Sequence, residues 1–324
     1  DTVLAVAFRG MGKDKTTGEA APFGAFCAGG DIRYFHQAAL AGDPTLEDFF
    51  TEEYSLNHLI HNYPKPTIAF MDGIVMGGGM GIAQGCNLRV VTERTKMAMP
   101  ETNIGLFPDV GGGYFLSRCP GHVGEYLALT GEVIGGRQAV AWGLADGYVE
   151  SQQLSRIWST LAFTPFESGS AAERWVATEF IADNERRTAD KPKIDATFGL
   201  PNVAAILNAL ENAAEPSDWT RATAKALRHR SPLMLHVVLE QIRRARHLGL
   251  ADDLRMERNM VRHCFHLRPG TASETVEGIR ALAVDKDHKP LWNPSTAELV
   301  TPEMVNAFFE PAWPAHANPL RTLA

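Results

Sequence analysis

Short apolar runs separated by turns and helical stretches characterise the first half of the chain. The runs have the length and composition of strands, which are predicted at Val3–Phe8, Thr67–Met71, Leu88–Val91 and Lys96–Met99. Strands that alternate with helices are typical of right-handed β-α units, whose strands stack or lie in parallel sheets. The pattern therefore predicts an α/β core that extends as far as Val149.

From about Gln152 onward the apolar positions recur at helical spacing instead. Helices are predicted at Ala171–Ala182, Val203–Asn212, Trp219–His229, Pro232–Leu248 and Leu254–Cys264. Linkers that contain Pro or Gly, such as Lys191–Pro201, are expected to separate them. The change of pattern predicts two regions, residues 1–150 and residues 151–324.

Composition narrows the class of protein. The 324 residues are 45% hydrophobic and 21% charged, which is ordinary for a globular enzyme. A net charge of −7 argues against general nucleic-acid binding. The sequence contains neither an apolar run of ~18 residues nor a recognisable signal peptide, so a membrane partner is not expected. The four cysteines show no C-x-x-C pairing and no metal-ligand spacing. We therefore expect free thiols, a reducing compartment and no bound metal. The cysteines are Cys27, Cys86, Cys119 and Cys264.

Two carboxylates in an apolar segment are the strongest chemical signal. Glu101 and Asp109 lie among Met99, Ile104 and Phe107. Acidic side chains in such surroundings are costly to desolvate unless they are paired or used. Two close carboxylates also tend to raise one of their pKa values, which suits proton transfer near neutral pH. We therefore predict a catalytic role for both residues.

Two glycine-rich loops precede this pair. The first is Phe26–Ile32, where Asp31 can cap a following helix, and the second is Gly77–Gly81, which follows the predicted strand Thr67–Met71. Glycine lets the backbone approach a ligand closely, and backbone amides at a helix N-terminus attract anions. No dinucleotide fingerprint or phosphate loop fits either run. The loops are instead suited to binding an oxyanion.

The order of these motifs resembles the crotonase (enoyl-CoA hydratase/isomerase) superfamily. The resemblance rests on Ala28–Ile32, Gly77–Gly79, Pro100-Glu101 and Thr130–Asp146. Within that superfamily, Pro108–Leu116 and the tail Glu277–Pro294 look like the 3-hydroxyisobutyryl-CoA hydrolase branch. The resemblance implies a crotonase-like spiral of ββα units over residues 1–150 that carries the acyl-CoA site, and a helical region over residues 151–324 that covers it.

The branch is indicated by one substitution. Hydratases of the superfamily carry a second glutamate just after the triple glycine, where this chain has Gly81, whereas the hydrolase branch has its second acid at the place of Asp109. The resemblance thus implies a thioesterase that releases 3-hydroxyisobutyrate or 3-hydroxypropionate from coenzyme A, as in valine degradation. It assigns the oxyanion hole to the amides of Gly30 and Gly78 and a substrate contact to Glu53. The alternative for Glu53 is a solvated helix face.

Several alternatives stay open at this level. Glu101 and Asp109 could activate water as a general base, or Glu101 could attack the thioester and form an anhydride. An enoyl-CoA hydratase or isomerase and a non-catalytic acyl-CoA-binding scaffold are the rival functions. No cofactor is expected, since coenzyme A is part of the substrate. A homo-oligomer is a further alternative, and the compartment would be the cytoplasm in a bacterium or the mitochondrial matrix in a eukaryote.

The beginning of the chain departs from the family pattern. Asp1–Leu4 lead directly into a strand, whereas the family has about forty further residues before it, including part of the coenzyme A contact surface. We therefore expect an N-terminal part of the core to be missing from this sequence. The insertion Met11–Pro22 is predicted to form a polar loop beside the site.

Overall fold

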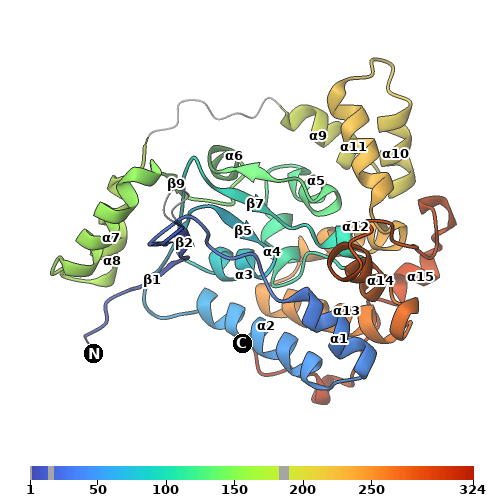
Figure 1. Cartoon of the computed structure of the whole chain (residues 1–324), viewed down its shortest axis with the longest axis horizontal. Helices are drawn as coiled ribbons and strands as arrows, with labels where there is room; N and C mark the ends of the chain where they lie inside the picture. The colour runs from blue at the N-terminus through green and yellow to red at the C-terminus, as the bar shows by residue number, and fades with distance from the viewer. Residues whose placement is uncertain (1, 14–17, 182–189) are drawn as a thin grey trace. The chain divides into compact units, whose positions relative to one another are not determined.

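A computed structural model describes residues 2–13, 18–181 and 190–324 (Figure 1). Residues 14–17 of the predicted polar loop and Ala182 of the predicted helix Ala171–Ala182 lie outside the described residues. On either side of residues 14–17, β2 (Gly12–Lys13) pairs with β3 (Ala20–Ala21) in an antiparallel ribbon.

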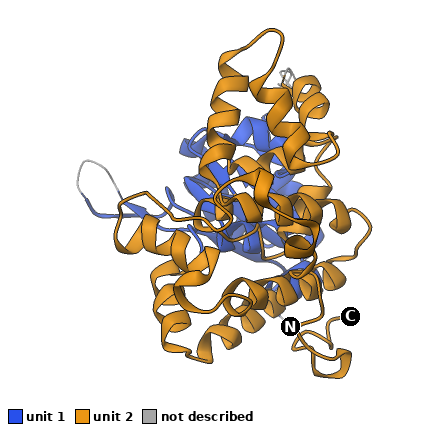
Figure 2. Ribbon diagram, turned by 90° about the vertical axis from the view of Figure 1, so that its right-hand side faces the viewer, with its two compact units in different colours: residues 1–29, 57–98, 133–189 blue, residues 30–56, 99–132, 190–324 orange. Residues whose placement is uncertain are grey.

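The described residues form two compact units, coloured separately in Figure 2. Unit 1 comprises the described residues of the ranges 1–29, 57–98 and 133–189, and unit 2 comprises those of 30–56, 99–132 and 190–324. Each unit therefore combines segments from the first half of the chain with later ones. The predicted boundary near residue 150 stays a prediction.

Unit 1 holds the sheets. One sheet has the order β1-β4-β6-β9 and all its neighbours are parallel; its strands are β1 (Val6–Arg9), β4 (Thr67–Met71), β6 (Leu88–Val91) and β9 (Gly147–Tyr148). A three-stranded sheet has the order β5-β7-β8, with one parallel and one antiparallel pair; its strands are β5 (Ile74–Met76), β7 (Lys96–Ala98) and β8 (Ile134–Gly135). The parallel sheet and the predicted strands at 67–71 and 88–91 are confirmed, while β1 begins later than predicted.

The core of unit 1 explains why β4 reads as an unbroken apolar run. All five residues of β4 are buried. Ile68 and Phe70 of β4 belong to one hydrophobic cluster with side chains from α7 (Leu154–Phe163) and α8 (Gly169–Thr178). Strands buried on both faces favour continuous apolar residues rather than alternation. The described part of unit 1 also contains the short helices α3 (Gly78–Gln84) and α6 (Gly136–Ala141), the 3₁₀ turn η2 (Ser151–Gln153) and the end of α2 (Thr45–His61).

Unit 2 is helical in its described part. Its elements are α1 (Ile32–Ala41), the larger part of α2 (Thr45–His61), η1 (Glu101–Ile104), α4 (Gly112–Ser117), α5 (Val123–Thr130), α9 (Lys191–Phe198), α10 (Val203–Glu211), α11 (Asp218–His229), α12 (Pro232–Ala245), α13 (Leu250–His266), η3 (Gly270–Ala272), α14 (Glu274–Ile279), the π-helical turn η4 (Arg280–Val284), η5 (Ala297–Leu299), α15 (Pro302–Asn306) and η6 (Ala315–Ala317). Asp31 caps α1, as predicted, by accepting bonds from the amides of Arg33 and Tyr34. The predicted helices at 203–212, 219–229, 232–248 and 254–264 are confirmed within a few residues at their ends.

The predicted linker Lys191–Pro201 is wrong, because its first eight residues form α9. Pro192 lies in the first turn of this helix, where a backbone amide has no partner within the helix, so the amide that proline lacks is not missed. Ile194 and Phe198 are one helical turn apart and both are fully buried. The apolar spacing within the segment therefore outweighs the helix-breaking tendency of its proline and glycine.

The helices of the second half pack on the acidic segment within unit 2. α12 contacts α4 and α5, α13 contacts α4, and α14 contacts η1. An aromatic cluster fills the interior beside α1 and α2, where Phe50 packs against Phe35, Tyr54 and Phe265. This packing buries the segment that carries both predicted catalytic carboxylates.

Candidate active site

The segment from Glu101 to Asp109 is shaped by a helical turn and a glycine. Glu101 opens η1, and Gly105 ends it with a φ of 64° while donating its amide to the Glu101 carbonyl. A methyl group at Gly105 would lie 2.3 Å from the carbonyl oxygen of Glu274, so only glycine fits. The Thr275 hydroxyl donates to the Gly105 carbonyl at 2.7 Å. These contacts fix the turn that leads from one carboxylate to the other.

Asp109 is buried and has one side-chain partner from α2. Its carboxyl is within the interior of unit 2, with 6% of the residue exposed. The Tyr54 hydroxyl, itself fully buried, donates to Oδ2 at 2.9 Å. Burial raises the pKa of Asp109 to about 6, although the bond from Tyr54 acts to lower it. Asp109 is therefore largely ionised at neutral pH and can accept a proton.

Glu101 occupies a less favourable environment for charge. It is buried, and among the described residues its Oε2 has no hydrogen-bond partner. Burial raises the pKa of Glu101 well above its usual value, and the negative charges of Asp109 and Glu53 add to this effect. The two predicted catalytic residues are thus close enough to interact electrostatically. Burial raises the pKa of both carboxyls, and only Asp109 has a hydrogen bond from a side chain that stabilises its charge, so the two carboxyls have the different environments expected of an acid–base pair.

Glu53 belongs to the same acidic cluster. It lies on α2, one residue before Tyr54, and is half-buried. Burial raises the pKa of Glu53 to about 8, and the charge of Asp109 contributes. A solvated helix face therefore does not describe this residue. The structure brings Glu53, Glu101 and Asp109 within electrostatic reach of one another, while the substrate contact assigned to Glu53 stays a prediction.

Glu53→Gln is expected to stabilise the fold at alkaline pH. The folded pKa of about 8 exceeds the usual value of 4.5, so the folded chain binds more protons than the unfolded chain between these values. Stability is then lost as pH rises through this window, and glutamine removes that loss. We expect the free energy of unfolding to rise by about 1–2 kcal/mol at pH 8.5 and not at pH 4. Urea unfolding at both pH values tests this, with the exposed neighbour Glu52→Gln as control.

The two glycine-rich loops meet within unit 1. Cys27 forms a parallel bridge with Val75, and the amide of Met76 donates to the Cys27 carbonyl at 3.0 Å. Gly29 has a φ of 90°, and a methyl group on it would lie 3.0 Å from the nitrogen of Gly78. Gly78 is the first residue of α3. The first loop therefore runs beside the amide that the sequence assigns to the oxyanion hole.

The other predicted oxyanion donor lies in unit 2. Gly30 precedes the helix cap Asp31, and a methyl group on it would lie 2.8 Å from the ring of Phe35. Because Gly30 and Gly78 belong to different units, the oxyanion hole formed by both amides stays a prediction. Gly81, which replaces the glutamate of hydratases, is buried within α3.

Sequence reasoning missed three buried side chains that hold the Asp109 segment. Glu257 and Asp253 of α13 accept bonds from backbone amides that follow Asp109, and Gln241 of α12 donates to the carbonyl of Pro108. A signal was present, since the two acids lie at helical spacing on the same face as Leu254 and Val261. Acids on an apolar helix face point to a buried partner.

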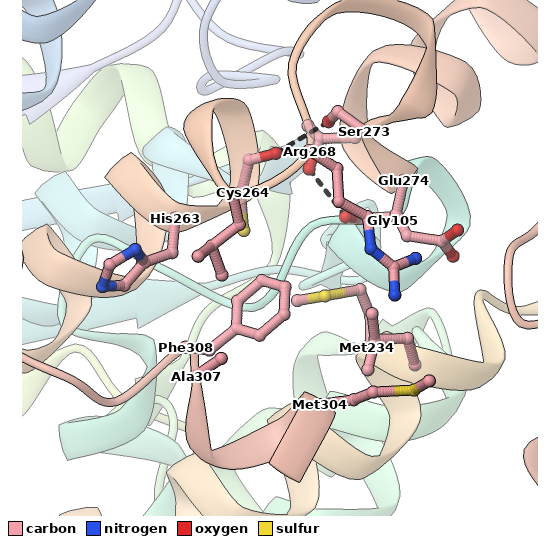
Figure 3. A pocket seen from close by; sticks show the side chains of 13 residues that line it. Gly105, Met234, His263, Cys264, Arg268, Ser273, Glu274, Met304, Ala307 and Phe308 are labelled. Atoms are coloured by element: carbon pink, nitrogen blue, oxygen red, sulfur yellow. Dashed lines mark hydrogen bonds between the residues drawn. The ribbon is translucent and has the colours of Figure 1, made fainter. Parts of the chain in front are cut away.

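A cavity of about 180 Å³ lies elsewhere in unit 2 and contains none of the predicted site residues. Its wall is mainly apolar, and Figure 3 shows Met234, Met304 and Phe308 around it, with Arg268 and Glu274 nearby. Gly105 also contributes to the wall. The cavity is therefore separate from the acidic cluster of Glu53, Glu101 and Asp109.

Metal-ligating groups and membrane-spanning helices can be looked for only in the described part of the chain. No group of His, Cys, Asp and Glu there could hold a metal ion. No described helix has both the length and the apolar character needed to cross a membrane. Cys27, Cys86 and Cys264 are free thiols.

Comparisons with known proteins agree on one family. Residues 14–309 match the family model described as enoyl-CoA hydratase/isomerase. The chain is 38% identical over 296 residues to a probable 3-hydroxyisobutyryl-CoA hydrolase 3 of Arabidopsis thaliana, covering 88% of this chain and 77% of the relative. It is 38% identical over 300 residues to a mitochondrial 3-hydroxyisobutyryl-CoA hydrolase of Xenopus tropicalis, covering 88% and 74%. A carnitinyl-CoA dehydratase structure from Mycobacterium thermoresistibile superposes with a TM-score of 0.83 and 36% identity, covering 96% of this chain and 84% of that one.

Proposed function

Because the chain belongs to the enoyl-CoA hydratase/isomerase family, we propose that it hydrolyses 3-hydroxyisobutyryl-CoA to coenzyme A and the free hydroxy acid, as in valine degradation. One observation carries the proposal. The second acid of the site is Asp109, buried and within electrostatic reach of Glu101, while position 81 holds a glycine. The names of the relatives from Arabidopsis thaliana and Xenopus tropicalis support the same substrate.

In the proposed reaction a water molecule attacks the thioester carbonyl carbon. Asp109 accepts the proton of that water, and the amides of Gly30 and Gly78 stabilise the oxyanion that forms. The carbon–sulfur bond then breaks, and Glu101 gives its proton to the departing sulfur of coenzyme A. The pKa of Asp109, about 6, and the pKa of Glu101, which burial raises well above its usual value, suit these two roles. Attack by Glu101 itself, with an anhydride opened by water, is the alternative route.

Tyr54→Phe is expected to move the acid limb of the pH–rate profile to higher pH by about one unit. The hydroxyl of Tyr54 stabilises ionised Asp109, so its loss raises the pKa of Asp109 further above about 6. The carboxylate that accepts the proton is then present only at higher pH. Turnover measured from pH 5 to 9 tests this, and an unchanged acid limb would contradict the assignment of Asp109 as base.

An enoyl-CoA hydratase or dehydratase is the second candidate function. The structural similarity to a protein named carnitinyl-CoA dehydratase favours it. Addition or removal of water at a double bond uses two carboxylates in the superfamily pattern, and Gly81 removes one of them. A non-catalytic acyl-CoA-binding protein would have no need for the buried acidic cluster.

The deciding experiment compares two substrates. Thiol release from 3-hydroxyisobutyryl-CoA is measured beside the loss of the enoyl absorbance of crotonyl-CoA. Thiol release without hydration is expected, and 3-hydroxypropionyl-CoA in a third assay gives the acyl preference, since one methyl group typically changes specificity ~10–200-fold. Hydration without thiol release would favour the second candidate, and no reaction with either would favour a binding protein.

The proposal extends to partners and compartment. An acyl-CoA is the expected partner. We also propose that the chain forms a homo-oligomer, and its molar mass in solution, measured by size-exclusion chromatography with light scattering, tests this. The vertebrate relative is named mitochondrial. We propose the mitochondrial matrix for this chain if its source is a eukaryote and the cytoplasm if it is a bacterium.

A further inference from the structure

We propose that Glu257, Asp253 and Gln241 are positioning residues that hold Asp109 in its productive geometry. The inference rests on the proposed function, in which Asp109 is the base. None of the three touches the reacting atoms in the proposed reaction. They act on the backbone on both sides of Asp109, from two helices more than a hundred residues further along the chain.

Glu257 makes the central contacts. Its Oε2 accepts a bond from the amide of Gly111 at 2.7 Å, and its Oε1 accepts one from the amide of Gly113 at 2.9 Å. One carboxyl therefore spans the turn that follows Asp109 and satisfies two amides near the start of α4. Such amides have no partner within the helix, and leaving them unpaired in the interior is costly.

Asp253 and Gln241 hold the same stretch of backbone, and we call these two residues together with Glu257 the clamp. Asp253 Oδ2 accepts the amide of Tyr114 at 2.8 Å. Gln241 Nε2 donates to the carbonyl of Pro108 at 2.7 Å and to Glu257 Oε1 at 3.2 Å. Pro108 directly precedes Asp109, so the backbone is held before and after the catalytic carboxylate. Gln241, Asp253 and Glu257 are all fully buried.

The turn that they hold is strained. Val110 has a φ of 57°, a region that β-branched residues rarely adopt, and Gly111 follows with a φ of 85°. Strained backbone persists only when its surroundings determine it fully, and it is common at active sites. A methyl group at Gly113 would lie 2.4 Å from Asp253 Oδ1, which shows how closely the clamp approaches the backbone. Without these contacts the turn can relax and carry Asp109 with it.

The clamp is also electrostatically expensive, which argues against a purely structural origin. Burial raises the pKa of Glu257, and the charges of Asp253 and Asp109 add to this, while the amides of Gly111 and Gly113 oppose it. Burial raises the pKa of Asp253 to about 6, while its hydrogen bonds with Glu257 and the amide of Tyr114, and the charge of Arg118, act to lower it. A buried pair of acids destabilises the fold unless its hydrogen bonds compensate. A local Ser or Asn could cap a short helix without this cost.

The test compares Glu257→Gln and Gln241→Met with the control Asp252→Asn. Asp252 neighbours Asp253 on α13 but is exposed and paired with Arg255. A glutamine at 257 has one acceptor oxygen for two amides, and a methionine at 241 cannot donate to Pro108. For thiol release from 3-hydroxyisobutyryl-CoA we expect kcat to fall about 10- to 100-fold in both variants. KM should change by less than about threefold, because binding is untouched.

Hydrogen exchange of residues 109–116 supplies a readout that does not depend on turnover. Faster exchange at Gly111, Gly113 and Tyr114 is expected in Glu257→Gln, and unchanged exchange in Asp252→Asn. Looser amides with an unchanged kcat would overturn the inference, as would a fall in kcat matched by the control. If Glu257→Gln does not fold, the kcat of Gln241→Met decides. Absence of hydrolysis by the unmodified protein would instead overturn the proposed function, while the exchange result would still report on the clamp.

Discussion

Glu101→Gln is expected to lower kcat for 3-hydroxyisobutyryl-CoA hydrolysis by about 10³-fold, within the range that general acid–base groups contribute. Glutamine has the size of glutamate but can neither give its proton to the leaving sulfur nor attack as a carboxylate. Glu101 is buried, and its Oε2 has no hydrogen-bond partner among the described residues, so the amide disturbs little else. Binding of the thioester should change by only a few fold.

A second consequence of Glu101→Gln separates loss of chemistry from loss of fold. Burial and the charge of Asp109 raise the pKa of Glu101 well above its usual value, so the ionised side chain destabilises the fold as pH rises. The variant should therefore unfold at a higher temperature than the unmodified protein at pH 8.5. The control is Glu52→Gln, on the exposed face of α2. A variant that keeps its full rate would exclude Glu101 from the mechanism.

The parts of the fold that the sequence predicted are those governed by local pattern. The runs at 67–71 and 88–91 are strands because their residues are apolar and continuous, and both lie in the parallel sheet. The long helices α12 and α13 follow from apolar spacing sustained over several turns. α9 was missed because its proline and glycine signals were given more weight than its two buried side chains.

In the candidate site, too, the residues marked by a local pattern could be predicted and their distant partners could not. Glu101 and Asp109 could be predicted because acids in an apolar segment are unusual, and Glu53 followed from the family resemblance. The partners of the Asp109 segment could not be predicted, because Tyr54 reaches Asp109 across 55 residues of sequence and Glu257 reaches the amide of Gly111 across 146. Such contacts depend on how helices pack, which a local pattern does not specify. The helix cap Asp31 lies at the other extreme, since its partners are two and three residues away.

Asp109→Asn is expected to lower kcat by about 10³-fold as well, with the fold preserved. The asparagine oxygen can still accept the bond that Tyr54 donates at 2.9 Å, so the side chain should keep its place. What is lost is the ability to take a proton from water. The measurement is single-turnover thiol release together with the dissociation constant of the thioester, and the control is the exposed Asp252→Asn.

The double variant Glu101→Gln with Asp109→Asn tests whether the two carboxyls act as one unit. If Asp109 activates the water and Glu101 protonates the leaving sulfur in the same reaction, removing both should cost little more than removing either, because the residual rate then comes from the remaining parts of the site. Effects that multiply to about 10⁶-fold would mean that the two residues contribute independently to the measured rate. A full rate in Asp109→Asn alone would assign the base elsewhere, and Glu53, whose pKa is raised to about 8 in the same cluster, would be the first residue to replace.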